Sequence, residues 1–453
     1  MSNKLFSSRM GVIAATLGSA VGLGNVWRFP AEAQANGGAA FLLLYIACVI
    51  ILGVPMMLVE MSLGRHGRSD VVGVFKKLEP GKPWWGVGAL AILASLLITG
   101  FYMVVEGWTA EYLWNSITGA LYEGTGESVA QTDAVLKARM GEYINSDFSP
   151  LIFTLVVFMI NVGILIGGVQ KGIERVSNIL MPMFFVVLAI LCCMTLSLDG
   201  AGEGLRWFLS PDFSLITWDT VVNALGQTFF SLSIGMGCIV TYASYYPDNT
   251  RLTGTAVIVA MMSLLVALMV GCVIFPSVTH FGLTDHGLAG STLVFRTLPN
   301  VFSMMPGTTF WSILFFTLLF VAALTSTVSM VEVTVAFMQE RLKLSRAKAV
   351  VLTVVPMIVL GIFSSLSFGS LSDFTIAGKT FFDLLDFIAT NLLLPLGGII
   401  LCIYVGWFAP KTMLREQLTN HGKTRLLLLN AIVFIIRYVA PLLIGVIMVF
   451  TFI

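Results

Sequence analysis

The composition of this chain predicts a membrane protein. Of 453 residues, 57% are hydrophobic and only 11% are charged, with a mean hydropathy of +0.93. A soluble domain normally carries about 25% charged residues, so a water-exposed surface is excluded for most of the molecule. The net charge of +1 also argues against a basic nucleic-acid-binding surface.

Eleven membrane-spanning helices are predicted, because a bilayer core of about 30 Å requires about 20 apolar residues per helix. Lipid cannot satisfy exposed backbone groups, and the apolar runs are too long for barrel strands. We therefore expect an all-α polytopic membrane protein. The predicted spans lie near residues 10–36, 39–64, 86–118, 149–168, 174–197, 217–245, 253–280, 308–340, 347–367, 376–408 and 426–453.

Two connecting segments are expected to be structured without crossing the membrane. Residues 119–148 form a polar outer loop, and residues 281–306 mix short apolar stretches with Gly and Pro, as in a re-entrant or capping hairpin.

With the N-terminus inside, 18 of the 25 Lys and Arg residues fall on the cytoplasmic side, as the positive-inside rule requires. Eleven spans then place the C-terminus outside. The apolar stretch that follows Lys4 and Arg9 continues into further spans, so no cleaved signal is expected.

Enzymatic and metal-centre chemistry are not indicated. The six cysteines all lie in apolar segments, and the four histidines are scattered near segment ends. We expect reduced, packed thiols and no disulfide. The intramembrane carboxylates are dispersed as well, so the clustered nucleophile, base or metal ligands of a membrane enzyme are missing.

Glycine-rich interruptions lie inside two of the spans. The first span contains Gly22-Leu-Gly24 and the sixth contains Gly235-Met-Gly237, each with hydroxyl or amide side chains nearby. Glycine favours an opened backbone, whose freed N–H and carbonyl groups must find a partner such as an ion or a substrate. Close helix packing through small residues is the alternative for one break alone.

The two breaks occupy corresponding positions in two groups of five spans. This is the pattern of an inverted-repeat transporter with its binding site near the midplane. We expect a first repeat over residues 1–197, a second over 198–410, and an additional span in 411–453, with the first and sixth spans unwound at mid-membrane.

Several motifs resemble the neurotransmitter:sodium symporter family, most closely its bacterial members of the multi-hydrophobic amino acid transporter type. The similarity runs through the first ten spans, whereas many relatives have twelve spans in all. The motifs are Gly18 to Pro30, Asn36 to Phe41, Gly53-Val-Pro55 with Glu60 and Gly64-Arg65, Glu106-Gly-Trp108, Gln227 to Ser233, Tyr242-Ala-Ser-Tyr245 and Leu324-Thr-Ser326.

The resemblance implies two sodium sites built from neutral oxygen ligands, which suit a hard cation. The substrate carboxylate would complete the first. Its ligands would be Ala20, Asn25, Ser231 and Ser263. The second site would use carbonyls of Gly18, Val21 and Ala322 with the hydroxyls of Thr325 and Ser326.

A chloride site is a further hypothesis. Relatives usually carry Asn or an acid where this chain has Ser263, and Ala267 also lacks the carboxylate of some bacterial members. A bound cation would therefore lack a fixed counter-charge. By resemblance to animal relatives, chloride would be held by Tyr45, Gln227, Ser231 and Ser263. A site that works without chloride is the open alternative.

The implied substrate site lies between the two breaks. Tyr102 matches the family tyrosine that holds the substrate carboxylate, half-helix N-termini would face the same group, and an apolar pocket would receive the side chain. The full set is Ala20, Gly22, Leu23, Gly24, Asn25, Ile98, Tyr102, Phe230, Ser231, Ser233, Met236, Ser326 and Met330.

The resemblance also implies gates. Arg28 and Asp386 match an outer ion pair, with Phe230 as a lid, while Glu32 receives no role. On the inner side, Phe6 and Glu340 match gate residues, and Asn3 replaces a family arginine, for which Lys4 is the candidate substitute.

Hinges are expected where glycine or proline weakens a helix. Gly172 and Pro182 bracket the start of the fifth span, where local unwinding or a static kink are both open interpretations. Gly235 and Gly237 would form the hinge of the sixth span, and Glu60 would brace its freed N–H groups.

The sequence thus predicts a sodium-coupled symporter that imports hydrophobic amino acids, aliphatic and aromatic, across a bacterial inner membrane. Sodium ions (two by resemblance), the amino acid and the lipid bilayer are the expected partners, and no nucleic acid is. Alternatives are a sodium-independent exchanger of the same fold and, further away, a channel.

Overall fold

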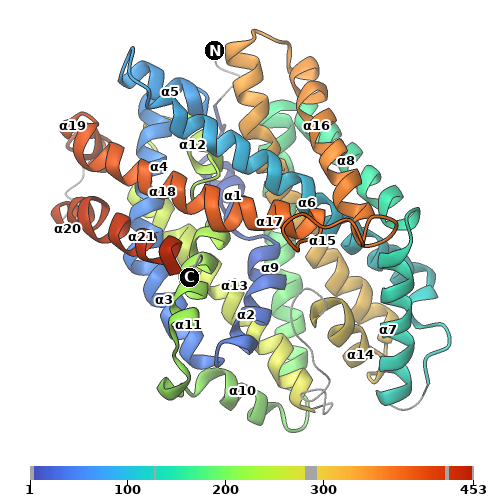
Figure 1. The fold of residues 1–453 in the computed structure, drawn as a ribbon. Coiled ribbons are helices and arrows are strands. Elements are labelled where there is room, and N and C mark those ends of the chain that lie inside the picture. Colours follow the sequence, from blue (N-terminus) through green and yellow to red (C-terminus); the bar gives the residue numbers. More distant parts are fainter. Residues whose placement is uncertain (1–4, 127–128, 281–292, 424–427, 451–453) are drawn as a thin grey trace.

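The computed structural model describes residues 5–126, 129–280, 293–423 and 428–450. Over these residues, helices form a single bundle (Figure 1). Within this described part of the chain, nine helices are long and apolar enough to cross a membrane, and ten are counted if the bent pair Arg9–Ala20 and Gly24–Ala35 is one span. The all-α polytopic fold is therefore confirmed, whereas the exact number of eleven spans stays a prediction.

The first five predicted spans correspond to segments of α, π and 3-10 helix. In chain order these are α1 (Arg9–Ala20), η2 (Gly24–Arg28), α2 (Phe29–Ala35), α3 (Ala39–Cys48), η3 (Val49–Gly53), α4 (Val54–Gly67), α5 (Val71–Leu78), α6 (Trp85–Thr118), η4 (Ala120–Tyr122), α7 (Val129–Asn145), α8 (Ser149–Ile166), η5 (Val169–Glu174) and α9 (Arg175–Leu196).

The second half of the chain begins with two short connecting elements and continues with the remaining predicted spans. It comprises α10 (Ala201–Leu209), η6 (Phe213–Leu215), α11 (Trp218–Ser231), α12 (Cys238–Ser244), α13 (Leu252–His280), η7 (Leu293–Thr297), α14 (Leu298–Ser303), α15 (Thr308–Arg341), α16 (Arg346–Leu366), α17 (Phe381–Asp386), η8 (Phe387–Leu393), α18 (Leu394–Ile403), η9 (Tyr404–Phe408), α19 (Lys411–Leu418), α20 (Leu429–Phe434), η10 (Ile435–Val439) and α21 (Ala440–Phe450).

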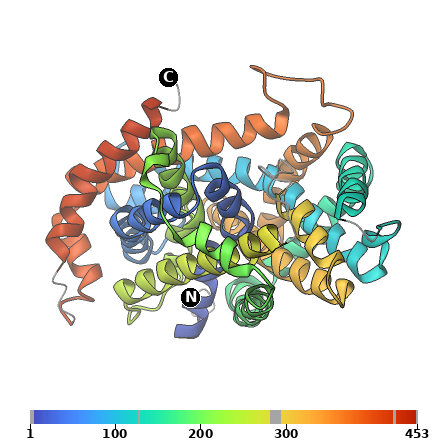
Figure 2. The same cartoon turned by 90° about the horizontal axis from the view of Figure 1, so that it is seen from below.

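The two long helices α6 and α15 form the centre of the bundle and pack against each other. In the most apolar stretch of each span, 78% of the residues of α15 are buried, but only 22% of those of Leu429–Val449. The last span therefore lies at the periphery, as Figure 2 shows for the red C-terminal helices at one edge. Its exposed apolar side chains are what a lipid-facing helix requires.

The connecting helices gather at opposite ends of the bundle. In Figure 1, α7, α10 and α14 lie at the lower end, and α5 lies at the upper end near the N-terminus. α7 was expected only as part of a polar loop, but it is helical and packs on α14. The expected hairpin over 281–306 falls partly outside the described residues; its later part forms η7 and α14.

Candidate functional site

The first break interrupts the helix after Ala20. Val21 takes an extended conformation (φ −111°, ψ 93°), and the chain bends by 46° before Gly24. The backbone N–H of Leu23, freed by this break, donates a hydrogen bond to the hydroxyl of Tyr102 at 2.8 Å. A side chain at Gly22 would lie 2.2 Å from the Ser326 hydroxyl oxygen, so only glycine allows this close approach.

Backbone carbonyls around the first break accept hydrogen bonds from polar side chains, most of them on other helices. The pairs are Gly18 with Ser326 Oγ at 3.1 Å, Ser19 with Ser233 Oγ at 2.7 Å, Ala20 with Asn25 Nδ2 at 3.3 Å and Ser263 Oγ at 3.4 Å, and Gly24 with Gln227 Nε2 at 2.8 Å. Gly18, Ser19 and Ala20 stand in the last turn of α1, where helix carbonyls lack regular backbone partners, so their oxygens are available to a cation.

The second break separates α11 from α12. Ser233, Gly235 and Gly237 have positive φ angles of 52°, 83° and 76°, a backbone conformation that glycine adopts without strain. The freed N–H of Gly235 donates to Glu60 Oε1 at 2.7 Å. The expectation that Glu60 braces the opened sixth span is thereby confirmed for one N–H group.

The residues expected at the first sodium site lie around Asn25. Its Nδ2 donates to Ser263 Oγ at 2.8 Å, and its Oδ1 is buried without a hydrogen-bond partner among the described residues. The Tyr45 hydroxyl lies beside both Ser231 and Ser263, so Ser231 belongs to the same group of side chains. A buried, unpaired amide oxygen among neutral oxygens fits a sodium ion.

The residues expected to hold chloride overlap with that cluster. Gln227 Nε2 donates to Ser231 Oγ at 2.9 Å. Gln227 Oε1 and the Tyr45 hydroxyl make no hydrogen bond of ordinary geometry to any residue that the structure describes. Chloride accepts hydrogen bonds, and Tyr45, Ser231 and Ser263 each carry an O–H that can donate. The structure therefore brings these four residues together.

The residues of the second expected sodium site also meet. Ser326 Oγ donates to Gly18 O, and Thr325 Oγ1 donates to Val321 O at 3.0 Å and Ala322 O at 3.2 Å. Val21, the remaining expected ligand, is the extended residue that ends α1. The hydroxyls bond to carbonyls in the way serine and threonine commonly do in helices, and reorientation would turn their oxygens towards an ion.

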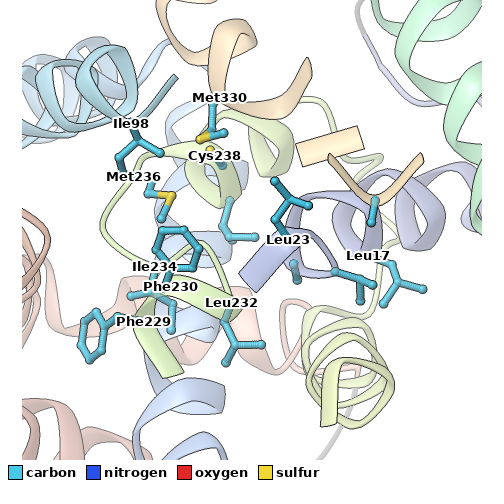
Figure 3. Packing of buried hydrophobic residues seen from close by; sticks show 14 of the residues in the cluster. Leu17, Leu23, Ile98, Phe229, Phe230, Leu232, Ile234, Met236, Cys238 and Met330 are labelled. Atoms are coloured by element: carbon cyan, nitrogen blue, oxygen red, sulfur yellow. The ribbon is translucent and has the colours of Figure 1, made fainter. Parts of the chain in front are cut away.

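A small cavity lies between the two breaks, with a volume of about 20 Å³, enough for about one water molecule. Its apolar side is formed by Ile98, Met236 and Met330, which point towards one another with Phe230 alongside (Figure 3). The described lining has no charged side chain. Its lining residues are Ser19, Gly22, Gly24, Ile98, Tyr102, Phe230, Ser231, Ser233, Met236, Ser326 and Met330.

Ten of these residues were expected from the sequence, and one was not. Ser19 lines the cavity, and its side chain also accepts a hydrogen bond from Ser329. Three residues that were expected to contact substrate do not line the cavity: Ala20, Leu23 and Asn25. They hydrogen-bond to each other or to Tyr102 beside it.

The outer side of the cavity is closed by Phe230 and Arg28. The Arg28 guanidinium lies over the Phe230 ring, 5.0 Å from its centroid. The expected pairing of Arg28 with Asp386 is not formed in this structure. Instead Arg28 Nε lies 3.6 Å from Glu32 Oε1, because a residue one helical turn away needs no movement of another span to reach it. Asp386 lies within electrostatic reach of Arg28.

On the inner side, Phe6 is buried among the rings of Tyr242, Tyr245 and Tyr246. Glu340 accepts hydrogen bonds from Ser69 Oγ at 2.7 Å and Asp70 N at 2.9 Å. The two expected inner-gate residues therefore sit in separate contacts. Asn3 and Lys4 lie outside the described residues.

A buried ion pair, which sequence reasoning did not identify, strengthens this inner side. Glu332 is fully buried and pairs with both terminal nitrogens of Arg346, at 2.8 and 2.6 Å, while the Tyr245 hydroxyl donates to it at 2.8 Å. A charge placed inside a span needs such a partner. Glu332 in the eighth predicted span is therefore a sequence signal of a nearby basic residue.

The hinge expected at the fifth span is wound in this structure. Gly172 lies in the π-helical segment η5, and Pro182 lies inside α9. A side chain at Gly172 would lie 2.0 Å from the Ile164 carbonyl oxygen. π-helical turns frequently mark functional sites. A cavity of about 350 Å³ between Gly167–Lys171 and Glu340 adjoins this segment.

Comparison with known proteins identifies relatives of the chain. A family described as "SNF: Sodium:neurotransmitter symporter family" matches residues 3–149 and 146–453. An uncharacterized sodium-dependent transporter, YhdH, of Bacillus subtilis is 35% identical over 442 residues, covering 96% of this chain and 95% of the relative. An uncharacterized sodium-dependent transporter of Haemophilus influenzae is 36% identical, covering 92% and 91%.

A solved structure agrees with both the sequence and the fold. The crystal structure of MhsT in complex with L-phenylalanine is 40% identical in sequence, with a TM-score of 0.90 over 98% of this chain and 99% of that chain. The family match covers nearly the whole sequence, and these relatives are transporters rather than enzymes. The chain belongs to the sodium:neurotransmitter symporter family, as a sodium-dependent multi-pass membrane transporter.

Proposed function

We propose that the protein imports hydrophobic L-amino acids, both aliphatic and aromatic, by coupling them to sodium through alternating access. The observation that carries this proposal is the apolar cavity against two opened helices. Ile98, Met236 and Met330 offer no charge to pair with a polar side chain, and pliable methionines adapt to several apolar shapes. MhsT, 40% identical, binds L-phenylalanine.

The two ends of the cavity suit the backbone of a free amino acid. The Tyr102 hydroxyl accepts from the Leu23 N–H at one edge, which leaves its own O–H able to donate to a carboxylate. Carbonyl oxygens of the breaks can accept from the ammonium group. The carboxylate would also supply a negative charge beside Asn25 and Ala20, so sodium and substrate would strengthen each other's binding.

Two sodium ions would provide the driving force, at the Asn25 cluster and between Gly18 and Thr325. Each charge moved is worth about 2.3 kcal/mol per 100 mV, and a tenfold gradient adds about 1.4 kcal/mol. Two ions therefore supply roughly 7 kcal/mol under those conditions. A zwitterionic substrate adds no electrical work.

The cavity of about 20 Å³ is too small for an amino acid, so binding requires the site to expand. Displacement of Phe230 and Arg28 would open it outwards, and unwinding near Gly172 would open it inwards. We also propose a bacterial inner-membrane location with the N-terminus cytoplasmic. The distribution of Lys and Arg supports this, as does the separation of α5 from α7, α10 and α14 at opposite ends.

Uptake of labelled leucine or tryptophan into proteoliposomes, with and without an inward sodium gradient, tests the proposal. Accumulation above equilibrium only with the gradient is expected. Sodium-independent exchange with internal substrate would favour an exchanger instead, and uptake that never exceeds equilibrium would favour a channel. Asn25→Ala should abolish the sodium dependence, while Asn115→Ala, at the far end of α6, should leave it unchanged.

A chloride ion beside Asn25 is a finer part of the proposal. The O–H groups of Tyr45, Ser231 and Ser263 converge, and the nearest sodium ligands are all uncharged. Replacement of chloride by gluconate should then lower sodium-driven uptake. Unchanged uptake in gluconate would leave a site that works with sodium alone.

A further inference from the structure

An open apolar groove lies beside the first turns of α6 and shares no lining residue with the cavity between the two breaks. Its volume is about 480 Å³, which is in the range of ligand-binding pockets, about 300–1,000 Å³. All of the lining side chains are apolar or absent. The groove is formed by Pro83, Trp84, Gly86, Val87, Ala89, Leu90, Leu93 and Ile400.

The groove follows the first turns of α6 and is closed on one side by α18. The space over Gly86 is open, since a Cβ atom added there would meet nothing within 4 Å. Trp84 lines one side of the groove, and its ring is held in place by packing on Tyr404 and Phe408, at centroid distances of 5.1 and 4.8 Å. Since α6 is a membrane span, the space beside it is filled by hydrocarbon chains.

The mouth of the groove lies at the end of α6 where polar and basic residues begin. Trp84 and Trp85 stand at this position, as tryptophans do at a membrane–water interface. The preceding helix α5 ends in the exposed residues Lys76 and Lys77, and the exposed Lys82 directly precedes Pro83. Figure 1 shows α5 at the upper end of the bundle, beside the start of α6.

Two of these lysines belong to the rim of the groove. Lys76 Nζ lies over the Trp85 ring, 5.5 Å from its centroid, and Lys82 Nζ is 2.7 Å from Glu79 Oε2 while more than half exposed. Lys77 is engaged by the carbonyls of Gly67 and Arg68. The charge at the rim is thus net positive, and basic clusters directly beside a span attract anionic lipid headgroups.

We propose that this groove is a binding site for an anionic phospholipid, with one acyl chain along Gly86, Ala89 and Leu93 and the headgroup phosphate at Lys76 and Lys82. The apolar walls account for the chain, since each buried methylene favours binding. The lysines account for the headgroup preference. The site is separate from the substrate cavity, and α6 connects the two because Ile98 and Tyr102 lie on the same helix.

Lipid binding to the purified protein tests this site by native mass spectrometry, with dioleoyl phosphatidylglycerol and dioleoyl phosphatidylcholine as probes. Combined Lys76→Gln and Lys82→Gln should weaken phosphatidylglycerol binding about fivefold for each lysine and leave phosphatidylcholine binding unchanged. The matched control is Lys343→Gln with Lys348→Gln, exposed lysines just before α16 and in its first turn, which should behave like the parent protein.

A second variant tests the acyl-chain part. Ala89→Trp fills the groove and should weaken both lipids, whereas Val355→Trp, on the exposed face of α16, should weaken neither. If Ala89→Trp does not fold, the lysine variants still decide the headgroup. Unchanged phosphatidylglycerol preference after removal of both lysines overturns the proposal, as does an equal loss in the control variants. The assay measures binding without transport, so it stands apart from the proposed substrate.

Discussion

The two closures of the central cavity differ in thickness. On the outer side, one aromatic ring and one cation cover it: Phe230 lies beneath Arg28, whose contact with Glu32 is a weak one at 3.6 Å. Above them, a further cavity of about 70 Å³ reaches towards α18 and α21. This side is therefore covered mainly by one aromatic side chain and the guanidinium above it.

The inner side is closed in several layers. Phe6 packs among three tyrosines, and beneath them Glu332, Arg346 and Tyr245 form a buried charged network. A third layer joins α1 to the fifth span, because the Glu174 carboxylate accepts hydrogen bonds from the N–H groups and hydroxyls of Ser7 and Ser8 at 2.7–3.1 Å.

The difference shows how the protein can favour one direction of opening. Rotation of a ring over a short distance costs little, whereas opening inwards must separate buried charges that have no water to replace their partners. Sodium and substrate at the site would therefore have to contribute to inner opening through their own contacts. The comparison is tested by weakening each closure separately.

The largest effect is expected at the Glu332–Arg346 pair. Arg346→Gln leaves a buried carboxylate without its cation, which costs about 3–5 kcal/mol in the closed inner state. We expect transport to fall at least about a hundredfold. A cysteine placed at Ala336, which lines the inner cavity, should react faster with a water-soluble thiol reagent applied from the inner side.

The double variant Glu332→Gln with Arg346→Gln is the matched control. Removing both partners avoids an uncompensated charge, so it should restore part of the slow labelling. Reactivity of the native cysteines is measured without the Ala336→Cys change. Labelling of Arg346→Gln at the parental rate would mean that this pair does not hold the inner side closed.

A smaller effect is expected at Glu174. Glu174→Gln removes a negative charge from the N-terminus of α1, where it is favourable, and weakens four hydrogen bonds. A loss of about 1.4 kcal/mol in the closed state would lower the apparent sodium affinity about tenfold. The sodium dependence of uptake measures this. Glu203→Gln, an exposed acid in the first turn of α10, should have no effect, and an equal response of both variants would contradict the assignment.

The sequence predicted the central cavity better than the closures, for a physical reason. Gly22, Gly24, Gly235 and Gly237 mark opened backbone directly in the pattern of residue types, and ten lining residues of the cavity are those that the family resemblance implied. Ser19 was missed because its helix position gave no sign that it would face inwards.

The gates depend instead on which of several partners a charge selects in three dimensions. The resemblance selected Asp386 on a distant helix and gave Glu32 no role, yet Glu32, one turn away, is the acid in contact with Arg28. The cap formed by Glu174 joins residues separated by 167 positions, and no local pattern predicts it. The number of spans depends on how a broken span is counted: within the described residues, α11 (Trp218–Ser231) and α12 (Cys238–Ser244) are each too short to be counted as a span.

The smallest effect is expected at the outer closure, and it sharpens the comparison most. A cation over an aromatic ring contributes about 0.5–1 kcal/mol when partly exposed, so Arg28→Gln should speed release of bound substrate to the outside only about two- to fivefold. Arg28→Lys keeps the charge and should lie between the parent and Arg28→Gln, while Glu32→Gln should change release least, because its contact with Arg28 is long and partly exposed. The rate of exchange of labelled leucine from sodium-loaded protein measures all three. A hundredfold acceleration in Arg28→Gln would show that the outer closure contributes as much free energy as the inner one. Any difference between the two sides would then have to come from the hinge at Gly172 rather than from the side chains that cover the cavity.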